Sequence, residues 1–135
     1  MITVLFACVE NAGRSQMAAA LFNRLADPAL AHAISAGTQP GDTVHPVVIE
    51  VMREAGIDLS SSRPRALAPD LVSSAGLLVT MGCGEACPVA PGADHEDWFL
   101  EDPRGQSLPA VRRIRDEISE RVRGLILAKG WGRRV

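Results

Sequence analysis

Long apolar segments and a strong net charge are both missing from this chain of 135 residues. No stretch approaches the ~20 apolar residues that a membrane-spanning helix needs. The short apolar start, residues 2–7, has no basic flank of the kind that precedes the apolar part of a secretory leader. The net charge of −2 gives no broad electrostatic case for binding nucleic acid or an anionic membrane. We therefore expect a cytoplasmic protein that holds any anionic ligand by local geometry.

Cysteines are also few. The chain has three, Cys8, Cys83 and Cys87, and an odd number argues against a structural disulfide framework. In a reducing compartment such thiols are reactive, bind a metal or pack as small apolar side chains. The spacing of Cys83, Cys87 and His95 is irregular, which makes them a weak set of zinc ligands. We therefore expect no metal site.

Apolar runs alternate along the chain with segments of helical periodicity. The predicted strands cover residues 2–7, 33–36, 77–81 and 98–100, and the predicted helices cover residues 15–25, 48–55 and 66–75, followed by a long C-terminal helix with its apolar face at Val111, Ile114, Ile118, Val122 and Leu125. Alternating strands and helices form parallel βαβ units, so we expect one α/β domain over residues 1–135. In such a sheet, ligands bind beyond the carboxyl ends of the strands.

Residues 8–15 connect the first predicted strand to the first predicted helix, and they carry the clearest chemical signal. A loop in this position can turn its backbone N–H groups inward, and the N-terminus of the helix adds positive potential. Together these features can seat a tetrahedral oxyanion, which Arg14 can bind through two parallel hydrogen bonds. The same surroundings favour the thiolate form of Cys8, which we predict to be a nucleophile.

Neighbouring residues of this segment support the same hypothesis. Ser15 can donate its hydroxyl to the thiolate, and Asn11 is suited to hold the loop through hydrogen bonds between its side chain and the backbone. The carboxylate of Glu10 would repel an anion, so we expect it to point outward. The predicted oxyanion-binding residues are Glu10, Asn11, Ala12, Gly13 and Arg14.

The spacing Cys-x5-Arg, between a buried strand and a helix, resembles the phosphate-binding loop of low-molecular-weight tyrosine phosphatases and of the thiol-dependent arsenate reductases that share their fold. Residues 14–18 are similar to the reductase branch, because phosphatases usually have proline where this chain has Gln16. Residues 35–37, 79–83, 87–88 and 97–103 are similar as well, so the resemblance extends over nearly the whole chain. It implies a three-layer α/β fold with a four-stranded parallel sheet in the order 2-1-3-4 and helices on both faces.

The resemblance also assigns roles to three residues outside the loop. Asp102, in an Asp-Pro pair, matches the family's general acid, and its carboxyl group can protonate the oxygen that leaves when a thiolate attacks arsenate. Cys83 matches the redox cysteine after the third strand, and Cys87 resembles the last cysteine of the reductases. In the implied strand order, Cys8 and Cys83 come within reach of each other. Cys83 would then attack the arsenic adduct of Cys8, and Cys87 would exchange with the resulting disulfide.

The source of electrons stays open at this stage. Three residues separate Cys83 from Cys87, fewer than in the thioredoxin-coupled branch, and Pro88 disfavours a helical conformation at Cys87. Chains with this spacing also resemble reductases that pass the adduct to a small thiol such as mycothiol. We therefore expect arsenate as the substrate, no bound cofactor, and an external thiol reductant, either thioredoxin or the mycothiol and mycoredoxin pair.

Two other functions are alternatives to arsenate reduction in arsenic detoxification. A low-molecular-weight tyrosine phosphatase would use the same loop, but Arg104 and Gly105 stand where phosphatases usually place aromatic residues, and the chain has no tyrosine. A non-enzymatic oxyanion or redox sensor would also use this loop, but it would have no use for a proton donor at Asp102. We therefore expect a reductase, with weak phosphatase side activity.

Overall fold

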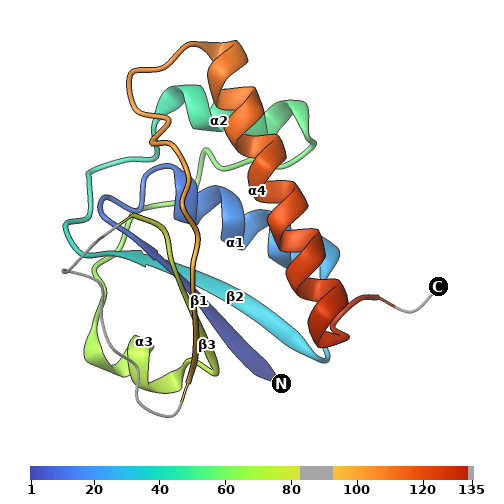
Figure 1. The fold of residues 1–135 in the computed structure, drawn as a ribbon. Helices are drawn as coiled ribbons and strands as arrows, with labels where there is room; N and C mark the ends of the chain where they lie inside the picture. Colours follow the sequence, from blue (N-terminus) through green and yellow to red (C-terminus); the bar gives the residue numbers. More distant parts are fainter. Residues whose placement is uncertain (83–92, 134–135) are drawn as a thin grey trace.

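A four-stranded parallel sheet forms the centre of the fold, in the order β2-β1-β3-β4 (Figure 1). The strands are β1 (Ile2–Cys8), β2 (Ala31–Gly37), β3 (Leu77–Thr80) and β4 (Asp94–Asp97). The computed structural model describes residues 1–82 and 93–133. The observed order confirms the order 2-1-3-4. β1 lies inside the sheet, which agrees with the burial of residues 4–8.

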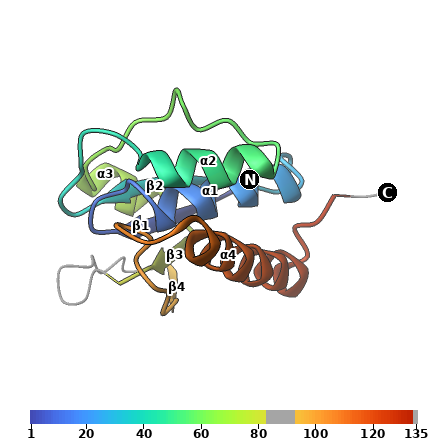
Figure 2. The same ribbon diagram turned by 90° about the horizontal axis from the view of Figure 1, so that it is seen from above.

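Helices cover both faces of this sheet, as the resemblance implies (Figure 2). They are α1 (Arg14–Leu25), α2 (Pro46–Glu54), α3 (Pro69–Ser74) and α4 (Leu108–Lys129). The larger core lies between one face and the helices α1, α2 and α4, which contribute Phe22, Met52 and Ile118 to it. On the other face, Leu71 and Val72 of α3 pack against a smaller core. Within residues 1–82 and 93–133, no helix is long and apolar enough to cross a membrane.

The carboxyl ends of β1, β2 and β3 lie side by side at one edge of the sheet. The register pairs Cys8 with Gly37, and Ala7 with Thr80. A Cβ atom at Gly37 would lie 2.5 Å from the carbonyl oxygen of Val9, so glycine is needed for the chain after Cys8 to pass this close to β2. This edge is where parallel sheets bind their ligands.

The predicted fourth strand, residues 98–100, is wrong, because β4 is Asp94–Asp97. β4 is an edge strand with mostly exposed side chains, so its sequence has no apolar run. The apolar signal comes instead from Trp98 and Leu100, which are buried just after the strand. The ring centroid of Trp98 lies 5.6 Å from that of Phe6, so the indole is part of the core.

The predicted helix over residues 66–75 is too long, because α3 begins at Pro69. Ala68, the residue before this proline, is extended, with φ −93° and ψ 149°. A proline ring disfavours the helical conformation in the preceding residue, whereas its own fixed φ suits the first turn of a helix. The remaining elements differ from prediction only in their ends. For example, α2 begins at Pro46 rather than at residue 48.

Candidate active site

The Cys8 loop, which we define as residues 8–14, joins the end of β1 to the start of α1. Cys8 is the last residue of β1 and Arg14 is the first residue of α1, one residue beyond each predicted boundary. The thiol of Cys8 is free and the residue is 3% exposed. The register of the sheet therefore holds the sulfur at the base of the loop.

The carbonyl groups of the Cys8 loop point away from its centre. Backbone N–H groups within residues 38–45 donate at 2.8–3.0 Å to the carbonyl oxygens of Cys8, Val9, Glu10 and Ala12. In a trans peptide the N–H group points opposite to the carbonyl of the same unit, so the N–H groups that follow these carbonyls face into the loop. One of them, the N–H of Asn11, donates to Cys8 Sγ at 3.3 Å. Inward N–H groups of this kind bind anions.

The sulfur of Cys8 lies among hydrogen-bond donors. Ser15 Oγ is 2.8 Å from Cys8 Sγ, and the side-chain amide of Asn11 donates to the same Oγ at 2.7 Å. Because the Ser15 oxygen accepts this bond, its own proton is free to be donated to the sulfur. The Asn11 N–H and the Ser15 hydroxyl are thus placed to stabilise negative charge on Cys8.

Asn11 is the buried connector of the loop, with none of its surface exposed. Its backbone has φ +52°, a left-handed conformation that asparagine tolerates better than most residues. Its Oδ1 accepts hydrogen bonds from the backbone N–H of Arg65 at 3.0 Å and from Gln16 Nε2 at 3.2 Å. These contacts link the loop to α1 and to the chain before α3, and so define its shape.

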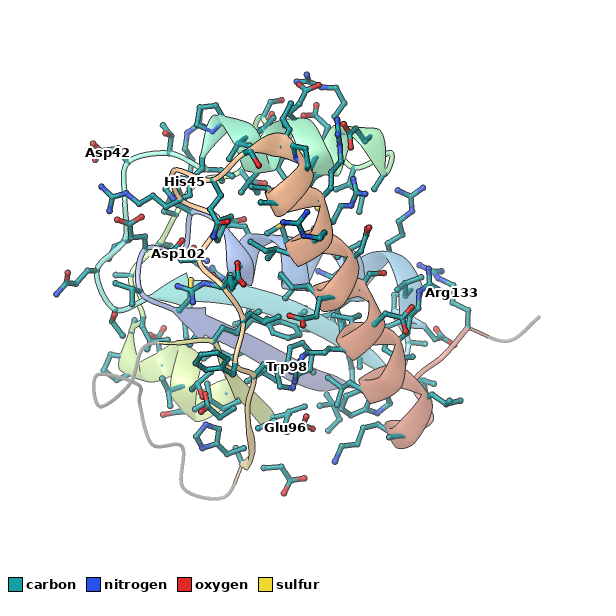
Figure 3. The ribbon with its side chains drawn as sticks, turned by 45° about the horizontal axis from the view of Figure 1, so that its top comes forward. Asp42, His45, Glu96, Trp98, Asp102 and Arg133 are labelled. Atoms are coloured by element: carbon teal, nitrogen blue, oxygen red, sulfur yellow. The ribbon has the colours of Figure 1, made fainter. Side chains whose placement is uncertain are left out.

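An open pocket of about 250 Å³ lies above the Cys8 loop. It brings together most of the predicted site residues, while Asn11 and Ser15 lie buried beneath it. The residues that line it are Cys8, Val9, Glu10, Ala12, Gly13, Arg14, His45, Gly82, Asp102 and Arg104. Figure 3 shows His45 and Asp102 on the chain segments near this pocket.

Arg14 extends from the start of α1 along the wall of the pocket. Its Nη1 donates to the carbonyl oxygen of Leu100 at 3.2 Å, and its Nη2 lies 3.8 Å from Asp102 Oδ2. Gly82 has φ +87°, and a Cβ atom there would lie 2.6 Å from Arg14 Nη1. Because Gly82 has no side chain, the guanidinium of Arg14 has room at this position. The side chain of Arg14 is 12% exposed and that of Asp102 is 56% exposed, so the carboxyl group is open to a ligand.

Glu10 is among the residues that line the pocket, and the expectation that its carboxylate points away from the anion stays a prediction. Glu10 Oε1 accepts a hydrogen bond from Arg104 Nη1 at 2.9 Å, and Glu10 Oε2 lies 3.3 Å from His45 Nε2. The guanidinium of Arg104 thus compensates the carboxylate that was expected to repel an anion, and His45 contacts it from the other side. This polar rim, Glu10, Arg104 and His45, forms one side of the pocket mouth.

Sequence reasoning missed His45 and Arg104 as pocket residues. The sequence favours a surface or capping role for His45, and the residue does stand at the N-cap position just before α2. Arg104 stands two positions after Asp102, and the resemblance places it where phosphatases usually have aromatic residues; both signals point to the pocket. Cys83 and Cys87 lie outside the described residues, so their predicted roles stay predictions. The third candidate zinc ligand, His95, has its Nε2 2.9 Å from Thr80 Oγ1.

Comparison with known proteins identifies the family. The family described as low molecular weight phosphotyrosine protein phosphatase matches residues 3–131. The chain belongs to this family. The parallel sheet, the helices on both faces and the loop after β1 are therefore the fold of this family and not a chance similarity of one segment.

Relatives within the family are named as arsenate reductases. A Halobacterium salinarum protein named as a candidate arsenate reductase is 44% identical, over 87% of this chain and 85% of that protein. The glutaredoxin arsenate reductase of Synechocystis sp. is 36% identical, over 93% of this chain and 97% of that protein. The structure of a thioredoxin-dependent arsenate reductase from Corynebacterium glutamicum superimposes with a TM-score of 0.82 at 38% identity. That match covers 95% of this chain but only 61% of the other, longer protein.

Proposed function

We propose that the protein reduces arsenate to arsenite through a covalent bond between arsenic and Cys8 Sγ, with external thiols as the source of electrons. One observation carries the proposal. A buried cysteine lies at the base of a pocket whose wall carries Arg14 and whose mouth carries Asp102. The names of the relatives support the same reaction, and the physiological role would be arsenic detoxification.

Arsenate binds in this proposal as an anion seated in the Cys8 loop. The inward backbone N–H groups donate to its oxygens, and the guanidinium of Arg14 binds two of them side by side. The N-terminus of α1 adds positive potential at the same point. Held in this way, the arsenic atom lies directly above Cys8 Sγ.

The first chemical step is a substitution at arsenic without change of oxidation state. The thiolate of Cys8 forms an S–As bond, and one arsenate oxygen leaves with the electron pair of its As–O bond. Hydroxide leaves poorly, so Asp102 donates a proton and the oxygen departs as water. The exposed carboxyl group of Asp102, close to Arg14 at the pocket mouth, is placed for this role.

The second step transfers the electrons. A second thiolate attacks Cys8 Sγ, an S–S bond forms, and the electron pair of the S–As bond stays on arsenic, which leaves as arsenite. The protein sulfur is oxidised and arsenic is reduced by two electrons. We propose Cys83 as the second thiol and Cys87 as the one that then attacks the disulfide, so that an external reductant reduces a Cys83–Cys87 bond.

The external reductant is a thiol protein or a small thiol. Relatives named for glutaredoxin and for thioredoxin support this class of partner. We favour a thioredoxin-type protein over mycothiol with mycoredoxin, because two cysteines beyond Cys8 suit a relay within the protein. Such exchange requires a reducing compartment, so we propose the cytoplasm as its location.

The decisive experiment is arsenite release from arsenate with three reductant systems supplied separately. These are thioredoxin with its reductase, glutaredoxin with glutathione, and mycothiol with mycoredoxin. We expect turnover with at least one system and none with Cys8→Ser in any of them. Arsenite release by Cys8→Ser at a rate close to that of the wild type would refute the adduct mechanism. Hydrolysis of p-nitrophenyl phosphate, measured in parallel, reports the expected weak phosphatase activity.

A further inference from the structure

Two chain segments meet above Cys8, the Cys8 loop and the residues 101–106, which we call the acid segment because it contains Asp102. Two contacts join them in addition to the approach of Arg14 to Asp102. A Cβ atom at Gly13 would lie 2.7 Å from Pro103 Cγ, so the proline ring packs directly on the loop. In the next residue of the acid segment, Arg104 Nη1 donates to Glu10 Oε1 at 2.9 Å. The ion pair thus connects the loop that binds the anion to the segment that carries the acid.

Arg104 also holds the carboxyl group of Asp102 through its backbone. The N–H of Arg104 donates to Asp102 Oδ1 at 3.0 Å, and Gln106 Nε2 donates to the Asp102 carbonyl oxygen at 2.7 Å. The contact between Asp102 and Arg14 is longer, at 3.8 Å, and is no hydrogen bond. The position of the acid therefore depends on where Arg104 is held, and Glu10 holds its side chain.

We propose that Glu10 is a positioning residue, whose ion pair with Arg104 keeps the acid segment closed on the Cys8 loop with Asp102 above the sulfur. This inference rests on the proposed role of Asp102 as the general acid. The basic groups that face Glu10 are the guanidinium of Arg104 and the imidazole of His45, at 2.9 and 3.3 Å. His45 supports the carboxylate from the start of α2, so Glu10 has a defined direction toward the acid segment.

Substitutions of Glu10 and Arg104 should affect arsenate affinity and the rate of the chemical step differently. Glu10 carries a negative charge in the wall of an anion pocket, so neutralising it favours binding of arsenate by simple electrostatics. Neutralising Arg104 has the opposite effect on binding. If the pair positions Asp102, both changes lower the rate of the chemical step, although they move arsenate affinity in opposite directions. A purely electrostatic role would change affinity and leave the chemical step as it was.

The test measures single-turnover arsenite formation with the reduced full-length protein and the reductant that supports turnover, over a range of arsenate concentrations. We expect Glu10→Gln to lower the limiting rate about fivefold, the scale of a hydrogen-bonded exposed ion pair, while half-saturation occurs at the same or a lower arsenate concentration. Arg104→Gln should lower the limiting rate by a similar factor and raise the half-saturating concentration. The double variant should be no slower than either single variant, because both changes break the same pair.

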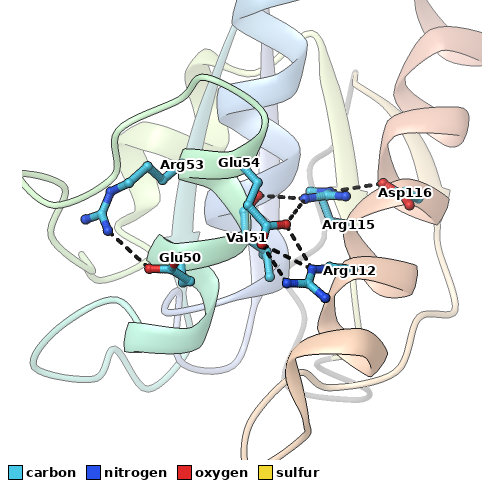
Figure 4. A network of polar contacts seen from close by, with 7 residues as sticks. All are labelled: Glu50, Val51, Arg53, Glu54, Arg112, Arg115 and Asp116. Carbon is cyan, nitrogen blue, oxygen red and sulfur yellow. Dashed lines mark hydrogen bonds and ion pairs between the residues drawn. The ribbon is translucent and has the colours of Figure 1, made fainter.

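Glu54→Gln is the matched control. Glu54 is exposed to the same extent as Glu10, with 33% against 32% of its side chain accessible, and it also bridges two basic side chains. Its partners are Arg112 at 2.8 Å and Arg115 at 3.0 Å, between α2 and α4 and outside the pocket (Figure 4). We expect Glu54→Gln to leave both kinetic quantities unchanged. Glu10→Asp, which keeps the charge but shortens the side chain, serves as a second variant and should lower the rate without a gain in affinity.

Three results would overturn the inference. The first is a limiting rate that stays at the wild-type value in Glu10→Gln and Glu10→Asp, and the second is a double variant in which the two losses multiply. The third is an equal loss in Glu54→Gln. Asp102→Asn separates this failure from a failure of the proposed mechanism. If Asp102→Asn keeps the wild-type rate, the proposed acid role of Asp102 is wrong. If Asp102→Asn is slow but Glu10→Gln keeps the wild-type rate, only the positioning role of Glu10 is wrong.

Discussion

Replacement of Asn11 by alanine tests how the Cys8 loop is held in shape. The side chain makes hydrogen bonds to Ser15 Oγ, to the backbone N–H of Arg65 and to Gln16 Nε2. At about 1 kcal/mol for each bond, their loss removes about 3 kcal/mol of stability. Alanine at φ +52° adds about 1 kcal/mol of backbone strain. The total is about 4 kcal/mol, a large part of the stability of a chain of this size.

The measurement for Asn11→Ala is thermal unfolding together with arsenite formation. About 4 kcal/mol corresponds to a drop in Tm of roughly 10–15 °C for a protein of this length. Below the unfolding temperature, the arsenate rate should still fall at least tenfold, because the N–H of residue 11 and the hydroxyl of Ser15 no longer face Cys8 Sγ.

Asn23→Ala is the control for this prediction. The side chain of Asn23 makes two hydrogen bonds, both to the backbone of Ala33, but it lies in α1 away from the pocket. It should lower Tm by only a few degrees and leave the arsenate rate unchanged, because alanine is favoured in a helix. An Asn11→Ala protein with a Tm within about 3 °C of the wild type and normal kinetics would show that Asn11 does not organise the loop.

Three further predictions concern the pocket and the proposed thiol relay. Arg14→Lys should lower kcat/KM for arsenate about a hundredfold or more although the charge is kept, because lysine lacks the planar fork; near-normal kinetics would show that charge alone suffices. Gly82→Ala should raise KM for arsenate, since its Cβ displaces the Arg14 guanidinium, and an unchanged KM would contradict the observed crowding. The double variant Cys83→Ser, Cys87→Ser should form the Cys8 adduct but fail to turn over with thioredoxin. Mass spectrometry of the trapped protein detects the adduct. Full turnover by the double variant would exclude the relay.

The fold follows from the sequence where neighbouring residues decide the structure. The buried run before Cys8 and the helical spacing after Arg14 are local patterns, so the path from strand through loop to helix was predictable to within one residue at each end. The order of the strands is not a local property. It came from the family resemblance, which the comparison with known proteins confirms.

The sequence was least informative where burial depends on distant parts of the chain. β4 lies at the edge of the sheet and needs no apolar residues, whereas the apolar residues that suggested a strand, Trp98 and Leu100, serve the core instead. The start of α3 was misplaced for another reason. Its helical pattern extends through Ala68, but the proline that follows holds that residue in an extended conformation.

By itself the sequence predicted that Cys8, Arg14 and Ser15 belong to one site, because they are close in the chain and their spacing limits how they fold. Only the tertiary structure decided how the pocket is charged. Glu10 meets Arg104 across 94 positions of sequence, and it meets His45 from another element, so no local pattern could give the direction of its carboxylate. Such contacts form only when the sheet has brought the carboxyl ends of its strands together. Because they depend on this long-range packing, the sequence alone could not predict the rim of the pocket.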